Sequence, residues 1–182
     1  MKSNVCSFWG HRKIEMTEDL KQKIKGIIED MIVNNNVRTF LFGSRSEFDN
    51  LCHLLVTELK EKYPNIKRKA YTCKSETCTL ESERQKWEGI YARFKREKVQ
   101  LLGVEESVEY KTKYIAGKAS YIERNKAMID DSDYCIFYYD KNYKPPQRKY
   151  SKRNVCYYQP QSGTAIAYAY AERKGKIVLN VF

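Results

Sequence analysis

The chain of 182 residues lacks any apolar run long enough to cross a membrane and has few residues that break regular structure. A membrane-spanning helix needs about 20 consecutive apolar residues, and no segment approaches that length. The first residues also lack the apolar stretch of a secretory signal, so we expect a cytoplasmic protein with no membrane partner. Only 8 glycines and 4 prolines, beside 42% apolar residues, exclude a collagen-like or largely disordered chain.

Two common nucleotide-binding fingerprints are missing, Gly-x-Gly-x-x-Gly and the Gly-Lys-Ser/Thr P-loop. Their absence argues against an ordinary NAD-dependent dehydrogenase, and we expect no cofactor. Among 6 cysteines only Cys73 and Cys78 lie close together, and no second pair or nearby histidine completes a zinc site, so we expect no metal. Without a secretory signal, the cysteines are expected to be reduced and mostly buried.

The charge balance, 34 Lys and Arg against 23 Asp and Glu, gives a net charge of +11 and indicates an anionic partner or a basic surface. The segment 141–161 contains no acidic residue. Three interpretations stay open for it: a lid over a nucleotide, a groove for single-stranded nucleic acid, or a solvated loop with tyrosines packed beneath. Its basic and aromatic residues are Lys141, Lys144, Arg148, Lys149, Lys152 and Arg153, with Tyr143, Tyr150, Tyr157 and Tyr158.

Apolar periodicity predicts alternating strands and helices in the first third of the chain. Strands are expected at 4–9, 37–42 and 66–72, and helices from about 17 to 34 and from 46 to 63. Thr17 and Ser46 are expected to cap the two helices, and Pro64 to end the second. The second helix has an apolar stripe formed by Phe48, Leu51, Leu54, Leu55 and Leu59.

The later segments continue this order less regularly. We expect a helix at about 82–98, a strand near 107–112, a helix from a capping box at Ser120 and Glu123 to about 131, a strand at 134–139, a helix at 163–173 and a strand at 177–182. The pattern predicts an α/β fold: a Rossmann-like, doubly wound, mostly parallel sheet with helices on both faces. We expect a single domain, 1–182, with a charged insertion at about 73–118 and a basic loop at about 141–161.

Ligands of such sheets bind at the carboxyl ends of the strands, often at helix N-termini that attract phosphate. Four loops qualify: 10–12, 43–46, the loop after Asp140, and 161–164. Arg12 and Arg45 could each bind phosphate through two hydrogen bonds. His11 is a candidate ligand contact, whereas His53 is expected to be a partly buried structural side chain.

Four motifs in this order resemble a known superfamily. They are CSFWGHR at 6–12, FGSRSEFD at 42–49, YIERNKAMIDDSD at 121–133, and SGT at 162–164 ahead of a helix and a terminal strand. The set is similar to the SLOG superfamily, which joins the Smf/DprA DNA-processing proteins and the lonely-guy cytokinin-activating enzymes, and most of all to its DUF1273/YpsA-like branch. The match covers roughly residues 4–72 and 119–182.

The resemblance implies a nucleotide site. In lonely-guy enzymes, a Glu-Arg-Lys motif and a Pro-Gly-Gly-x-Gly-Thr-x-x-Glu loop bind a nucleoside monophosphate, and the arginine and last glutamate cleave the base from ribose 5-phosphate. Here Glu123-Arg124-Asn125 parallels the first motif, so the catalytic role of the arginine would fall to Arg124. Ala167 stands at the position of the glutamate, and Glu123 and Glu47 are candidates to replace it.

The sequence therefore predicts a protein that binds a nucleotide or nucleotide-derived molecule, as a sensor or sequestering module. An N-glycosidase or phosphoribohydrolase acting on nucleotides is the first alternative, and a protein that binds single-stranded nucleic acid is the second. The tyrosines and the resemblance are compatible with a homo-oligomer. The expected ligand-binding residues are Gly10, His11, Arg12, Gly43, Ser44, Arg45, Arg124, Asn125, Ser162, Gly163 and Thr164.

Overall fold

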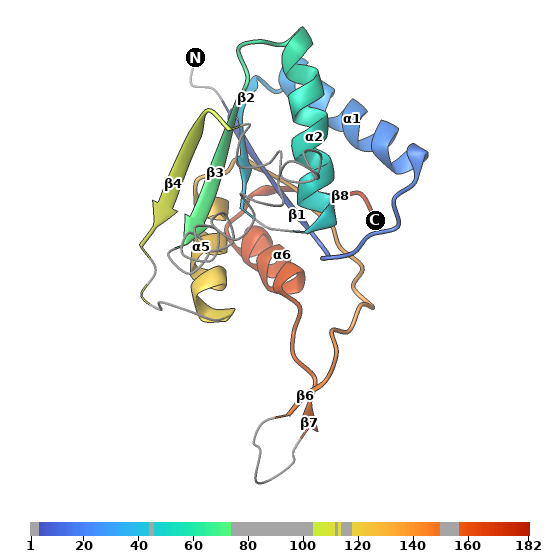
Figure 1. The fold of residues 1–182 in the computed structure, drawn as a ribbon, viewed down its shortest axis with the longest axis vertical. Coiled ribbons are helices and arrows are strands. Elements are labelled where there is room, and N and C mark those ends of the chain that lie inside the picture. Colours follow the sequence, from blue (N-terminus) through green and yellow to red (C-terminus); the bar gives the residue numbers. More distant parts are fainter. Residues whose placement is uncertain (1–3, 44–45, 74–103, 112, 114–117, 150–156) are drawn as a thin grey trace, which may run out of the picture.

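The computed structural model describes residues 4–43, 46–73, 104–111, 113, 118–149 and 157–182 (Figure 1). They form a six-stranded sheet in which every neighbouring pair is parallel. In spatial order the strands are β4 (Glu106–Tyr110), β3 (Lys67–Cys73), β2 (Val37–Phe42), β1 (Asn4–Gly10), β5 (Tyr134–Tyr138) and β8 (Ile177–Asn180). The helices among the described residues are α1 (Glu18–Val33), α2 (Glu47–Lys62), α5 (Lys118–Asp130) and α6 (Gly163–Arg173).

This strand order confirms the Rossmann-like fold. The chain builds outward from β1 through β2 and β3 to β4, and then returns to place β5 and β8 on the other side of β1. The direction of winding therefore reverses between β1 and β5. In open α/β sheets the loops on either side of such a reversal diverge and leave a crevice at the carboxyl ends of the strands.

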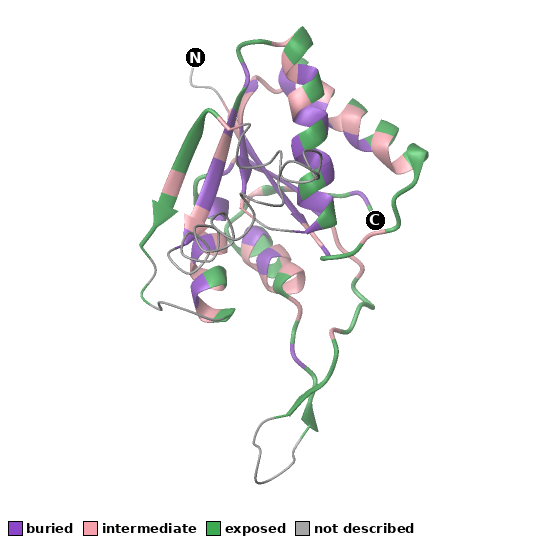
Figure 2. Ribbon diagram, viewed as in Figure 1, coloured by how far each residue is buried: buried purple, intermediate pink, exposed green. Residues whose placement is uncertain are grey.

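Buried apolar residues form a layer on each face of the sheet. Ile24, Ile28 and Met31 of α1 join residues of α2 in one cluster, while Met128 of α5 and Ala171 of α6 belong to the other. The central strands between these layers are largely buried (Figure 2). Burial on both faces explains why β1, β2 and β5 read as nearly continuous apolar runs.

The predicted helix caps of α1 and α2 are confirmed. The Thr17 hydroxyl accepts a hydrogen bond from the Leu20 amide at 3.1 Å, and the Ser46 hydroxyl accepts one from the Asp49 amide, also at 3.1 Å. Each bond satisfies an amide that has no partner within the first turn of a helix. Helix α2 ends at Lys62, directly before Tyr63 and Pro64, as expected.

Three local predictions were wrong. Leu54 is 49% exposed, and Cys52 and Val56 are buried on α2 instead, because the buried face of the helix lies slightly to one side of the predicted stripe. His53 is not partly but fully buried, at 1% exposure. Ser120 does not open its helix, because α5 begins at Lys118 and Ser120 lies inside it, buried beside the Cys73 thiol.

The two predicted insertions contain one expected strand and one unexpected pair of strands among the described residues. The strand expected near 107–112 is present as the edge strand β4, whereas the helix expected at 82–98 lies outside the described residues. The basic loop contains a short antiparallel pair that the sequence did not predict, β6 (Arg148–Lys149) with β7 (Tyr157–Tyr158). Residues 141–149 and 157–161, here called the basic arm, project away from the sheet (Figure 1).

Within the described residues, no helix is both long and apolar enough to span a membrane. The four described cysteines, Cys6, Cys52, Cys73 and Cys135, are buried free thiols, as expected of core residues.

Candidate functional site

The ends of β1 and β5 are joined by a hydrogen bond at the point where the sheet winding reverses. His11, 5% exposed, accepts this bond at Nε2 from the Asp140 amide, at 3.0 Å. Burial lowers the pKa of His11 more than its contact with Asp140 raises it, which keeps the imidazole neutral and able to accept. The backbone approaches closely here, since a Cβ on Gly10 would lie 2.3 Å from Phe48 Cβ. Gly10 and His11 thus set how closely β1, α2 and the loop after β5 approach one another.

Aromatic rings extend from this point to α6. The ring centroid of His11 lies 4.3 Å from that of Tyr143 and 6.0 Å from that of Tyr139, and Tyr139 in turn lies 4.8 Å from Tyr168 of α6. Tyr143 is 44% exposed and the other two tyrosines are half-buried. We call Tyr139, Tyr143 and Tyr168 the aromatic shelf. Flat rings that are partly open to solvent are suited to stacking against a nucleobase.

A buried arginine lies beneath the loop that follows β2. Arg124 of α5 is 3% exposed, and its Nη1 donates to the Tyr71 carbonyl at 3.4 Å. A Cβ on Gly43 would lie 2.4 Å from that nitrogen, so only glycine leaves room for the guanidinium. The next residue, Asn125, is half-buried, and its Oδ1 has no hydrogen-bond partner in the part of the chain that the structure describes. A permanent positive charge therefore lies close under this edge of the sheet.

The N-terminus of α6 has two available amides. The Ser162 hydroxyl caps the helix by accepting from the Ala165 amide at 3.0 Å. The amides of Gly163 and Thr164 have no protein partner among the described residues. Such amides, aligned with the helix dipole, attract anions.

One cation, Lys118, contacts the residue ahead of this helix cap. Lys118 Nζ donates to the Gln161 carbonyl at 2.7 Å, directly ahead of Ser162. Partial desolvation lowers the pKa of Lys118, and the nearby charge of Arg148 lowers it further. An anion near these positive charges would be favoured electrostatically.

The carboxylates proposed as replacements for the missing glutamate bond to backbone amides. Glu47 Oε2 accepts from the Ile14 amide at 3.0 Å, and Glu123 Oε2 accepts from the Lys113 amide at 2.6 Å. The residue at the family position, Ala167, is 3% exposed and packs in the core.

Of the two loops that carry an arginine, the structure describes Arg12 but not Arg45. Arg12 is exposed, and its carbonyl accepts from the Glu47 amide at 3.0 Å. Ser44 and Arg45 lie outside the described residues.

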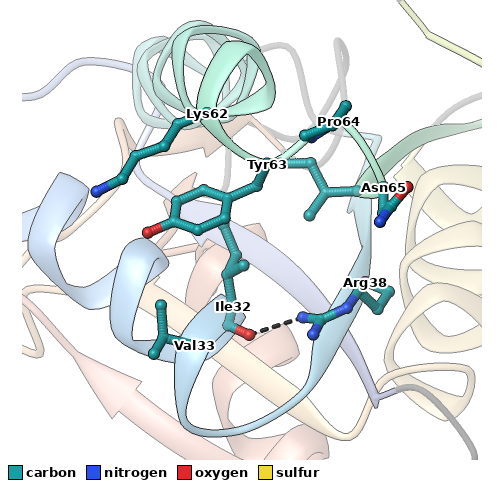
Figure 3. Close-up of a pocket in the computed structure, with 8 residues that line it drawn as sticks. Ile32, Val33, Arg38, Lys62, Tyr63, Pro64 and Asn65 are labelled. Atoms are coloured by element: carbon teal, nitrogen blue, oxygen red, sulfur yellow. Dashed lines mark hydrogen bonds between the residues drawn. The ribbon is translucent and has the colours of Figure 1, made fainter.

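A hollow of about 280 Å³ lies near the amino-terminal ends of β2 and β3, away from the loops at the carboxyl ends of the strands (Figure 3). The Arg38 guanidinium in its wall donates to the Ile32 carbonyl, near the end of α1, at 2.7 Å and to the Val37 carbonyl at 3.0 Å. This hollow contains none of the predicted site residues. It is lined by Ile32, Val33, Arg38, Lys62, Tyr63, Pro64, Asn65 and Ile66.

Comparison with known proteins decides the family. The profile of the YspA SLOG family, also called YpsA, matches residues 7–173. The chain belongs to this family. The resemblance inferred from the sequence motifs, including its YpsA-like branch, is therefore confirmed.

This SLOG chain is similar to a curated protein in sequence and to a solved structure in fold. It is 31% identical over 129 residues to the uncharacterized SPbeta prophage-derived protein YoqJ of Bacillus subtilis (strain 168), covering 66% of this chain and 72% of YoqJ. Its fold is similar to that of DNA processing protein A from Helicobacter pylori, a structure reported for its single-stranded DNA binding mode, with a TM-score of 0.50 and 16% identity. That match covers 96% of this chain and 63% of the other, and at this identity it shows the fold alone.

Sequence reasoning missed three contributors to this edge of the SLOG fold. Tyr168 follows Thr164 by four residues, a spacing that places both on one side of a helix and could have been recognised. The Asp140 amide and Lys118 gave no signal, because their roles depend on His11 and Gln161, which are distant in sequence.

Proposed function

We propose that this chain binds a nucleotide or a nucleotide-derived small molecule at the carboxyl ends of the strands, as a sensor or sequestering module. The N-terminus of α6 carries the proposal. Its amides at Gly163 and Thr164 are available beside Lys118, which suits a phosphate group. Tyr168 begins the aromatic shelf one turn further along the same helix, which suits a base.

Family membership supports a ligand of this kind. The structure of DNA processing protein A was reported for binding single-stranded DNA, which is built from the same phosphates and bases. The buried Arg124 beneath Gly43 adds positive charge along the same edge of the sheet. Arg12, Ser44, Arg45 and, on α5, Asn125 remain proposed contacts.

Binding is favoured over hydrolysis of the glycosidic bond. That reaction passes through a positively charged, oxocarbenium-like state and needs a carboxylate or an activated water beside the sugar. Ala167 supplies neither, and Glu47 and Glu123 already accept hydrogen bonds from backbone amides. An intact bound ligand is therefore the expected outcome.

Equilibrium dialysis tests the proposal. The purified protein is dialysed against nucleoside mono-, di- and triphosphates, NAD, ADP-ribose and cyclic dinucleotides, and both chambers are analysed by mass spectrometry. Retention of one intact compound, at one molecule per chain, supports the sensor or sequestering function. Release of a base with a sugar phosphate would show an enzyme instead, and no retention of any compound would refute a nucleotide site.

A matched pair of variants tests the α6 end. Gly163 is the first helical residue, where proline is well tolerated, and the extended backbone of Ser162 (φ −68°, ψ 150°) suits a following proline. Gly163→Pro removes the amide donor, whereas Gly163→Ala keeps it, and a Cβ meets nothing within 4 Å. We expect about tenfold weaker binding for the proline variant only, as for one lost charge-assisted hydrogen bond. Equal affinities would exclude this amide from the site.

A further inference from the structure

The basic arm is strongly charged, and apart from Tyr143 the proposed nucleotide site does not use it. Between 141 and 161 the chain has six Lys and Arg and no Asp or Glu. Figure 2 shows the described part of the arm as almost entirely exposed, and Tyr157 and Tyr158 are 56% and 43% exposed. Exposed aromatic rings and cations together are the two kinds of group that contact the bases and phosphates of a single strand.

The strand pairing places a cation beside a tyrosine on each face of the arm. Arg148 pairs with Tyr158, and Lys149 pairs with Tyr157. Directly opposed residues point to the same face of a two-stranded ribbon, and successive residues point to opposite faces. The Lys149 ammonium lies 5.8 Å from the ring centroid of Tyr157. Both faces thus present one positive group and one aromatic ring side by side.

The arm is anchored at its root. The Asp140 carboxylate accepts from the Asn142 amide at 2.8 Å, and the Asp140 carbonyl accepts from the Tyr143 amide at 3.1 Å. The Gln159 side-chain amide donates to the Pro145 carbonyl across the two legs. These bonds hold the legs together, and the described part of the arm projects away from the body of the protein (Figure 1).

We propose that the basic arm binds single-stranded nucleic acid, with Arg148 and Lys149 on phosphates and Tyr157 and Tyr158 stacked on bases. Unpaired bases offer the free faces that the exposed tyrosine rings need, whereas a duplex hides them. A lipid surface suits the arm less well. Segments that lie in membranes use Leu, Phe or Trp, and 141–161 contains none of them.

Fluorescence anisotropy with a labelled oligothymidylate of about 20 nucleotides tests this proposal. Replacing both Tyr157 and Tyr158 by Ala should weaken binding at least about tenfold, while replacing both by Phe, which keeps the rings, should preserve affinity. All four substitutions are at exposed positions, and circular dichroism checks that each variant is folded. Equal affinities for the Ala and Phe variants would overturn the stacking role.

The charged pair is tested through salt dependence. In Arg148→Gln with Lys149→Gln, the slope of log affinity against log salt concentration should fall by about 1.4, for two lost phosphate contacts on a single strand. The matched control is Lys21→Gln with Lys25→Gln on α1, which removes the same charge from the body of the protein and should leave the slope unchanged.

Competing partners give distinct outcomes. The duplex of this oligothymidylate with oligoadenylate should bind more weakly than the single strand, and vesicles of phosphatidylcholine with phosphatidylserine should not bind through the arm. Equal binding of duplex and single strand, an equal effect of the α1 control, or arm-dependent binding to vesicles alone would each overturn the proposal. Because the site at α6 is tested by Gly163→Pro with free nucleotides, failure of either proposal leaves the other distinguishable.

Discussion

The buried imidazole of His53 predicts that the protein loses stability as the pH falls from 6.5 towards 4. His53 is 1% exposed and packs edge-on against Phe42, with 4.9 Å between the ring centroids. Its Nε2 has no hydrogen-bond partner within the described part of the chain. Burial lowers the pKa of His53 to about 4, and the charge of Arg68 contributes, while that of Glu105 opposes it. Protonating this side chain in the folded state would place a second positive charge beside Arg68 in the core.

The sign and size follow from proton linkage. Between pH 6.5 and 4 the unfolded chain binds a proton at this histidine and the folded chain does not, so acid favours unfolding. At 1.36 kcal/mol for each pH unit, the lowered pKa corresponds to a loss of about 3 kcal/mol. That is a large part of the roughly 5 to 15 kcal/mol by which small domains are stable.

The substitution His53→Leu isolates this effect, because leucine has a similar volume and does not titrate. Urea unfolding followed by circular dichroism gives the free energy of unfolding of both proteins above pH 6.5 and near pH 4. The difference between variant and wild type, which cancels the titration of His11 and the carboxylates, should move by about 3 kcal/mol in favour of the variant. A difference that stays constant with pH, or a His53 resonance that titrates near 6.5 in the folded protein, would refute the reasoning.

Two further stability predictions concern close packing and an ion pair. Gly10→Ala should lower the free energy of unfolding by about 3 kcal/mol in urea titrations, because the new Cβ would lie 2.3 Å from Phe48 Cβ. Gly163→Ala is the control and should change the free energy of unfolding little. Similar values for both variants would show that the backbone at Gly10 adapts easily to a Cβ. Partial burial raises the pKa of Glu105, but hydrogen bonds from the Arg68 side chain and amide outweigh it and lower the pKa to about 2. The Glu105 carboxylate therefore stabilises the fold above about pH 4.5, and this effect is lost as the pH falls towards 2. Glu105→Gln should lower the free energy of unfolding by about 2 kcal/mol at neutral pH and remove that acid dependence. A variant that unfolds with unchanged acid sensitivity would contradict the assignment.

The fold was predictable where periodicity and caps agreed. Helix α1 has both a cap at Thr17 and an apolar repeat, and β1, β2 and β5 have apolar runs that burial on two faces requires. The pair β6 and β7 was not predictable, because two-residue strands have no period and their side chains are exposed. Ser120 resembles a helix cap in sequence, but the helix starts earlier and buries it against β3, a tertiary effect that overrides a local motif.

The site shows the same division between local and tertiary information. Motifs placed candidate residues on the loops at the carboxyl ends of the strands, since parallel strands bring those loops to one edge. They could not indicate which polar atoms are already used: His11 Nε2 accepts from Asp140, and Glu47 accepts from Ile14. A substitution at either residue would disturb the loops as well as any ligand contact. Removing a single amide at Gly163, which has no internal partner among the described residues, separates binding from folding more cleanly than changing a motif side chain.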